Sequence, residues 1–106
     1  MAADAQVTVR DDAERHRFEV LVDGAVAGFA AYRRENGAVA FTHTEIDDSH
    51  EGDGLGSQLV RGALDQVRAS GASVLPYCPF VASYLKKHVE LQDLVPAADR
   101  GRFDLA

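Results

Sequence analysis

Three glycines at alternate positions stand directly before a helical pattern in this sequence. They are Gly52, Gly54 and Gly56, and the apolar stripe that accompanies them begins at Leu55 and Leu59. Glycine lets a backbone approach a ligand closely, and the first turn of a helix presents N–H groups without intrahelical partners. This combination is typical of a binding site for an anion, most often a phosphate. The glycine spacing by itself is equally compatible with a tight turn that binds nothing.

Two common phosphate loops are excluded by the residues around these glycines. A nucleotide P-loop ends in Gly-Lys-Ser/Thr, whereas Gly56 is followed here by Ser57 and Gln58. A dinucleotide-binding loop that starts at Gly54 needs a small residue where Leu59 stands, and it follows a parallel strand early in the fold. A phosphate site here therefore requires another kind of loop.

The segments before the glycines alternate polar and apolar residues, as half-buried strands do. Asp23-Gly24 and Asn36-Gly37 are strong signals for two-residue hairpin turns. We therefore expect an antiparallel meander of four strands, over residues 6–10, 17–22, 25–33 and 38–46.

After the glycines the hydrophobic pattern takes a helical period, and Gly71 stands where a C-terminal cap belongs. The apolar stripe consists of Leu55, Leu59, Val60, Ala63, Leu64 and Val67. Residues 73–77 read as a short fifth strand, and Pro79 suits the first position of a second helix. A strand–helix–strand crossover is right-handed and joins parallel strands, so the fifth strand should lie parallel to the fourth. The expected fold class is α+β (mixed α/β).

The end of the sequence carries little pattern. We expect Leu94 and Val95 to dock on the core, which would span about residues 6–96, and the last residues to fray.

Composition indicates a single soluble domain over residues 1–106, with a formal charge of −6. That charge argues against nucleic acid as a partner, and the chain has no apolar run of membrane-spanning length. The single cysteine, Cys78, cannot form an internal disulfide, which favours a reducing, cytoplasmic location. His16, His50 and His88 lack partners at metal-ligand spacing, so we expect no metal site.

The order of meander, glycine loop, helix, short strand and helix resembles the GNAT superfamily of acetyl-coenzyme A-dependent N-acetyltransferases. The pyrophosphate loop of that superfamily has the form Arg/Gln-x-x-Gly-x-Gly/Ala. The segment from Glu51 matches it at Gly54 and Gly56 and departs at the first position, where Glu51 replaces Arg or Gln. The sequence is most similar to the minimal, YjdJ-like GNAT proteins. The stretches that carry this similarity are 42–45, 51–60, 76–81, 84–88 and 93–96.

The resemblance implies where acetyl-coenzyme A would bind. Strands four and five of the superfamily splay apart, and the acyl-pantetheine arm lies in the gap and bonds the backbone of strand four. In this sequence, that gap would be flanked by residues 43–46 and 74–78. The residues expected to bind the cofactor are Thr44, Glu45, Ile46, Gly52, Asp53, Gly54, Leu55, Gly56, Ser57, Cys78 and Lys86. The alternative for Lys86 and Lys87 is a solvated helix end.

Four residues are candidates for catalysis. An imidazole is suited to act as general base for an amine near neutral pH, which makes His43 a candidate, but His43 can equally be a hydrogen-bonded strand histidine. Glu45 lies two residues on, hence on the same strand face, and can orient His43, act as the base, or be a solvated carboxylate. Cys78 precedes Pro79 and can accept the acetyl group, contact the ligand sulfur, or fill an apolar hole. The resemblance assigns protonation of the leaving thiolate to Tyr84, whose spacing also fits a core stripe.

The leading function is an N-acetyltransferase that moves an acetyl group from acetyl-coenzyme A to an amine, by direct attack or through Cys78. The acceptor is a small amine, a peptide or a protein, and the chain is a monomer or a homodimer. A second function is a module that binds coenzyme A or acyl-coenzyme A without turnover. A third is an interaction domain whose glycine loop is only a turn.

Overall fold

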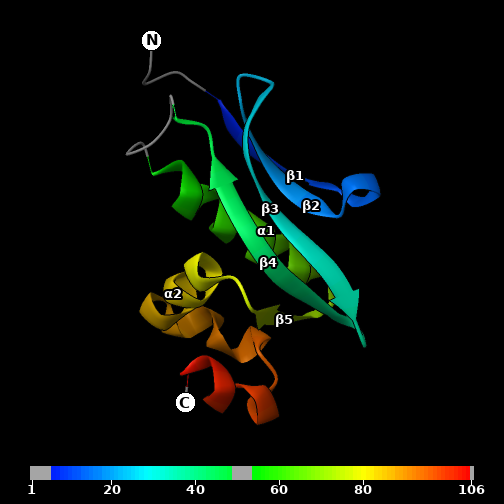
Figure 1. Cartoon of the computed structure of the whole chain (residues 1–106), viewed down its shortest axis with the longest axis vertical. Coiled ribbons are helices and arrows are strands. Elements are labelled where there is room, and N and C mark those ends of the chain that lie inside the picture. The colour runs from blue at the N-terminus through cyan, green and yellow to red at the C-terminus, as the bar shows by residue number, and fades with distance from the viewer. Residues whose placement is uncertain (1–5, 49–53, 106) are drawn as a thin grey trace.

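The computed structural model describes residues 6–48 and 54–105, and its sheet follows the predicted order. The first four strands form an antiparallel meander, and the fifth lies parallel to the fourth, in the order β1-β2-β3-β4-β5 (Figure 1). The strands are β1 (Val7–Asp12), β2 (Arg17–Val22), β3 (Ala25–Glu35), β4 (Ala38–Ile46) and β5 (Ser73–Pro76). Asp23, Gly24, Asn36 and Gly37 all have positive φ, as two-residue hairpin turns require. The predicted α+β class and both hairpins are confirmed.

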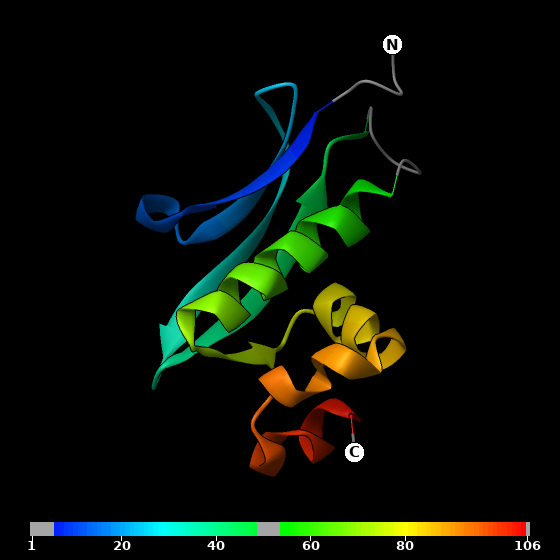
Figure 2. The same ribbon diagram turned by 180° about the vertical axis from the view of Figure 1, so that it is seen from behind.

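One helix covers one face of this sheet. Helix α1 (Leu55–Ser70) lies behind the strands in the view of Figure 1 and in front of them in the view of Figure 2. The whole predicted stripe, from Leu55 to Val67, is buried against the sheet. Gly71 ends the helix with φ of 80° and donates its N–H to Val67 and Arg68, so the predicted cap is confirmed.

The second helix begins where the sequence predicted. Helix α2 (Pro79–Lys87) has Pro79 in its first turn and Cys78 as its N-cap residue. Val81 and Leu85 join the core on the same side of the sheet as α1. Within the described residues, the opposite face of β2, β3 and the end of β4 carries no helix, and it faces the viewer in Figure 1.

A β-bulge in β4 decides which side chains reach that uncovered face. The register between β3 and β4 shifts there, because Tyr32 pairs with Phe41 while its neighbour Ala31 pairs with His43. Thr42 is therefore an extra residue, and an extra residue reverses the inward and outward alternation of the rest of its strand. Without the bulge, His43 would share the inward face of Phe41; instead, Thr44 and Ile46 turn toward the helices, and His43 and Glu45 point outward.

Strand β5 pairs along its whole length, but only with the first half of β4. The parallel ladder joins Ala38–Phe41 to Ser73–Pro76 and stops there. Beyond it, β4 continues to Ile46 and, within the described residues, pairs with β3 alone, while the chain after β5 turns away into α2. The expected gap between strands four and five thus opens at the bulge.

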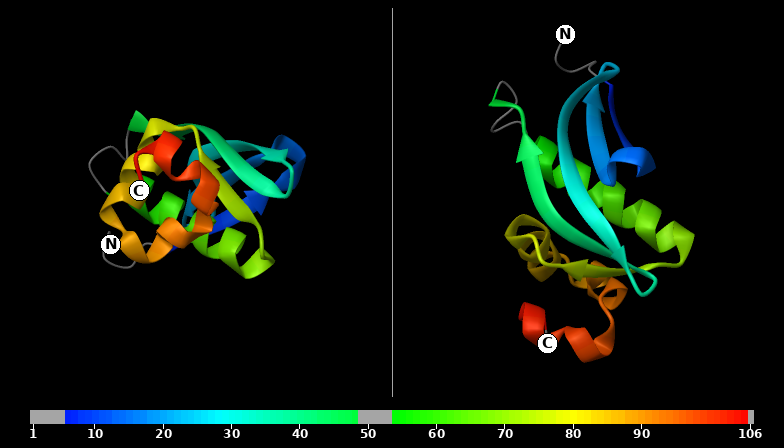
Figure 3. Two further views of the ribbon diagram at one scale, coloured as in Figure 1. Left: turned by 90° about the horizontal axis from the view of Figure 1, so that it is seen from below. Right: turned by 45° about the vertical axis from the view of Figure 1, so that its right-hand side comes forward.

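The end of the chain is more ordered than the sequence suggested. Three short 3-10 helices follow α2, over Val89–Leu94, Ala97–Asp99 and Gly101–Phe103 (Figure 3). Leu94 and Val95 are buried as predicted, but Leu105 is also buried, at 6% exposure. Phe103 packs on Ala38, Ala40 and Leu75, at the end of the sheet face that no helix covers. The structure therefore differs from the expected fraying. Phe103 and Leu105 dock the tail, but two apolar residues do not produce a helical period that the sequence pattern could show.

No helix among the described residues combines the length and the apolar character needed to cross a membrane.

Candidate functional site

The start of α1 carries the part of the glycine loop that the structure describes. Gly54 is the N-cap residue with φ of 76°, a left-handed conformation that favours glycine. Gly54 has no side chain to cap this end, and among the described residues the backbone bonds of this turn begin with the Gln58 N–H, which donates to the Gly54 carbonyl. The amides of Leu55, Gly56 and Ser57 thus open the helix as donors suited to an anion. The predicted binding residues Gly52 and Asp53, with Glu51, lie outside the described residues.

Packing against Phe80 also explains why residue 56 is a glycine. A Cβ added there would lie 2.7 Å from Cζ of Phe80, whose ring from α2 covers this turn. The Phe80 ring can therefore keep this position over the first turn of α1 because residue 56 lacks a side chain. The alternative of a tight turn accounts for both glycines without a ligand, so other groups must decide what this end of the molecule binds.

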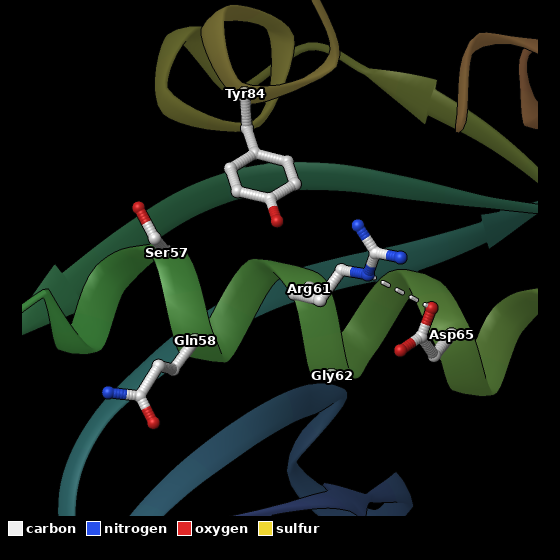
Figure 4. A pocket seen from close by; sticks show the side chains of 6 residues that line it. All are labelled: Ser57, Gln58, Arg61, Gly62, Asp65 and Tyr84. Atoms are coloured by element: carbon white, nitrogen blue, oxygen red, sulfur yellow. Dashed lines mark ion pairs between the residues drawn. The ribbon is translucent and has the colours of Figure 1, made fainter. Parts of the chain in front are cut away.

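Two hollows flank Tyr84 between the helices, and Ser57 and Tyr84 line both. The larger one encloses about 440 Å³ and is lined by Ser57, Gln58, Arg61, Gly62, Asp65 and Tyr84 (Figure 4). The smaller one encloses about 90 Å³ and is lined by Ser57, Phe80, Ser83, Tyr84, Lys87 and His88. Cys78 lines neither hollow.

Cationic and aromatic side chains give these hollows their character. The Tyr84 ring stacks on His88 with centroids 3.9 Å apart, and Nδ1 of His88 donates to the Tyr84 carbonyl at 2.7 Å. The Tyr84 hydroxyl, and then the Glu90 carboxylate, hold the pKa of Arg61 above its ordinary value. Arg61 also approaches Asp65, at 3.4 Å. A planar ring beside fixed positive charge suits an anionic ligand with an aromatic part.

Sequence reasoning missed most of this groove. It selected Lys86, which lies 3.9 Å from Asp104 of the tail, whereas its neighbour Lys87 lines the smaller hollow. It did not name Arg61 among the site residues. The signal that could have found the groove was the spacing of Ser57, Arg61 and Asp65 at four-residue intervals, which puts a polar stripe along one line of α1.

Cys78 lies at the mouth of the gap between β4 and β5, on the helix side of β4. It is buried at 3% exposure, and its N–H donates to the Phe41 carbonyl at 2.9 Å. Its Sγ lies 3.3 Å from Oγ1 of Thr44 and shares a hydrogen bond with it. The structure thus brings together two predicted site residues from opposite walls of the gap.

The backbone of β4 also faces the gap. The Asp47 N–H donates to the Ala27 carbonyl on β3, and this bond shows which backbone groups of β4 point toward β3. Because backbone groups alternate along a strand, those of His43 and Glu45 also bond toward β3, and those of Thr44 and Ile46 face the side that β5 has left. This is where the acyl-pantetheine arm was expected to bond the backbone of strand four.

His43 and Glu45 form a pair on the uncovered face. Nε2 of His43 lies 3.0 Å from Oε2 of Glu45, with both side chains mostly exposed. When Nε2 donates to the carboxylate, Nδ1 of the neutral imidazole can accept a proton. The prediction that the two residues share a face is confirmed. His43 and Cys78, however, lie on opposite faces of β4, so the four predicted catalytic residues do not form one cluster.

No group of His, Cys, Asp or Glu suited to holding a metal occurs within residues 6–48 and 54–105.

Comparison with known proteins agrees with this architecture. The family model described as GCN5-related N-acetyl-transferase matches residues 17–94, about three quarters of the chain. The match spans the meander from β2 onward, the glycine loop, both helices and the gap. No curated protein matches the sequence. The chain belongs to the GCN5-related N-acetyltransferase family.

Proposed function

We propose that this acetyltransferase-family protein uses acetyl-coenzyme A and transfers the acetyl group to an amine. The observation that carries the proposal is the parting of β4 and β5 at Thr42, at the same end of the sheet as the start of α1. An extended acyl arm fits beside a strand edge whose amides lack a neighbouring strand, and the opening amides of α1 suit the phosphates that precede that arm.

The groove between the helices would hold the nucleotide end of the donor. Arg61 and Lys87 supply positive charge, and Ser57 supplies a hydroxyl next to the opening amides of α1. Tyr84 presents a ring held by His88. In this role Tyr84 contacts the donor, and its predicted role as the acid for the leaving thiolate remains a proposal.

The gap would hold the thioester. The amides of Thr44 and Ile46 face it and would donate to the thioester oxygen as negative charge develops there. Cys78 and Thr44 stand on its helix side, within reach of each other. In the direct route, Cys78 contacts the donor sulfur, and in the covalent route its thiolate would accept the acetyl group.

The amine would approach from the uncovered sheet face. His43 lies there with Nδ1 free to take a proton from the amine, and Glu45 would stabilise the imidazolium through the 3.0 Å contact. Because no helix walls this face, a flexible acceptor such as a peptide or protein amine fits as well as a small one.

Two measurements test this function. Calorimetry with coenzyme A should show binding that Arg61→Ala and Lys87→Ala weaken, since both cations would contact its phosphates. Release of free thiol from acetyl-coenzyme A in the presence of an amine panel measures turnover. Binding without turnover for every amine, peptide and protein tried would identify a non-catalytic coenzyme A module. No binding at millimolar coenzyme A would exclude both the acetyltransferase and the non-catalytic module.

Variants then separate the routes. His43→Ala should lower kcat while leaving coenzyme A affinity within about twofold, as expected for a group that acts in the transition state. Cys78→Ala should abolish activity if the acetyl group passes through the thiol, and reduce it only modestly if the amine attacks directly. Full activity in both variants would show that neither residue takes part.

A further inference from the structure

A buried carboxylate stands on the sheet face that no helix covers. Glu19 is the buried charged residue of the described chain, at 1% exposure. Arg10 donates Nε and Nη2 to its Oε1 at 2.9 and 2.8 Å, and Arg17 donates Nε and Nη2 to its Oε2, both at 2.8 Å. Burying a carboxylate is costly even when it is paired, and a well-packed apolar residue often serves stability as well. Glu19 therefore calls for a reason other than core packing.

The reason lies in what Arg17 touches next. Its guanidinium carbon lies 4.6 Å from the centroid of the Phe29 ring on β3. The same ring lies 6.2 Å from the ring of His43 on β4, at an interplanar angle of 60°. The registers explain these contacts, since Arg17 and His43 both pair with Ala31, and Phe29 is diagonal to each. A continuous series of contacts thus runs from Glu19 through Arg17 and Phe29 to His43.

His43 has few other constraints. Its side chain is 59% exposed and it lies on the part of β4 that β5 has left. Its partner Glu45 is 63% exposed, and a contact between two exposed side chains holds neither one firmly. The Phe29 ring is the packed surface against which the imidazole rests.

We propose that Glu19, Arg17 and Phe29 are positioning residues that hold the His43 ring for proton transfer. The proposal rests on the proposed role of His43 as general base. Glu19 fixes the guanidinium of Arg17, the guanidinium lies over the Phe29 ring, and the Phe29 ring sets the orientation of the imidazole. A lysine at position 17 can keep a charge contact with Glu19, but it cannot supply the planar fork and stacking surface.

The chain offers a matched control. Arg33 pairs with Glu35, two residues on, at 2.7 Å, and its guanidinium carbon lies 5.3 Å from the Tyr77 ring. This unit has the same Arg-x-Glu spacing as Arg17 with Glu19 and also places a guanidinium over an aromatic ring, but that ring is a tyrosine, its ion pair is more exposed, and it lies beside the C-terminal tail rather than His43. Arg33→Lys therefore removes a similar arginine–ring contact without touching the series.

The first test measures ring position without any activity. The ring protons of His43 are assigned by their loss in His43→Gln, and their NMR shifts report the ring current of Phe29. Arg17→Lys and Phe29→Leu should move these resonances, Phe29→Tyr should restore them, and Arg33→Lys should leave them in place. Unchanged His43 resonances in Arg17→Lys and Phe29→Leu would overturn the proposal whether or not the protein is an enzyme.

The second test uses turnover. Arg17→Lys and Phe29→Leu should lower kcat about tenfold through misplacement of the base, with the KM for acetyl-coenzyme A within about twofold of wild type. Phe29→Tyr and Arg33→Lys should retain wild-type kcat. Shifted resonances with unchanged kcat would overturn the proposed effect on proton transfer. A wild-type protein without turnover would instead refute the proposed function, while the NMR result would still decide the arrangement.

Discussion

At the scale of single residues, the sharpest electrostatic feature away from the site is the Tyr32 hydroxyl. Tyr32 is buried at 4% exposure on β3, and its hydroxyl donates to a carboxylate oxygen of Asp11 on β1. Burial, and then the hydrogen bond to Asp11, raise the pKa of Tyr32 to about 12. The phenol is thus held in its neutral form, and it ties the first strand to the third across β2.

This shift predicts a specific pH dependence. Because the folded-state pKa of Tyr32 lies above the unfolded value of about 10, its contribution to stability is complete below pH 10. That contribution is lost as pH rises from about 10 through 12. Urea unfolding of wild type and Tyr32→Phe should differ by about 1–3 kcal/mol at pH 8, with the difference shrinking over this range. A constant difference up to pH 12 would contradict the shift.

At the scale of elements, the bulge at Thr42 is the feature on which the site depends. Its own side chain contributes little, since it is exposed and makes one contact of 3.4 Å to the Ala31 carbonyl. Its backbone, by contrast, decides the face of every later residue in β4.

Thr42→Ala and deletion of Thr42 should therefore differ sharply. The substitution should change the free energy of unfolding by no more than about 0.5 kcal/mol, as expected for an exposed side chain. The deletion would turn His43 and Glu45 toward the helices and expose Ile46, so it should cause a large loss of stability or prevent folding. Circular dichroism and urea unfolding measure both, and a deletion variant as stable as Thr42→Ala would show that the bulge does not set the faces of β4.

The same element shows what the sequence could and could not predict. The hairpins at Asp23-Gly24 and Asn36-Gly37, the α1 stripe and the Cys78–Pro79 helix start were predicted because each is encoded locally by turn chemistry or period. Nothing in the type of Thr42 marks a bulge, which arises from pairing between distant residues. The separation of His43 from Cys78 by β4, and the contact between Phe29 and His43, depend on that pairing and were therefore missed.

At the scale of the whole molecule, the two faces of the sheet are covered by different means. Helices α1 and α2 bury one face, whereas the tail covers only the end of the other, where Phe103 packs on Ala38, Ala40 and Leu75 (Figure 3). Arg102 lies over the rings of both Phe103 and Tyr77 and completes this cover. The rest of that face, with Phe29, His43 and Glu45, stays open.

Removing the tail should consequently destabilise the protein without altering the proposed donor site. A chain that ends at Pro96 would expose the apolar patch under Phe103 and leave a hole where Leu105 enters the core. For a chain of this size, the loss of a few kcal/mol corresponds to a fall in melting temperature on the order of 10 °C or more.

Point variants of the tail should reproduce this effect in part. Phe103→Ala and Leu105→Ala should each lower the melting temperature by a fraction of that amount. Arg100→Lys loses the bond from its Nε to the Val95 carbonyl but removes no apolar area, so it should lower the melting temperature less than either. If the truncated chain melts at the wild-type temperature, the tail does not dock in solution. If the truncated chain instead binds coenzyme A more weakly at a temperature where it is fully folded, the tail contributes to the donor site. The assignment of a purely stabilising role to the tail would then be wrong.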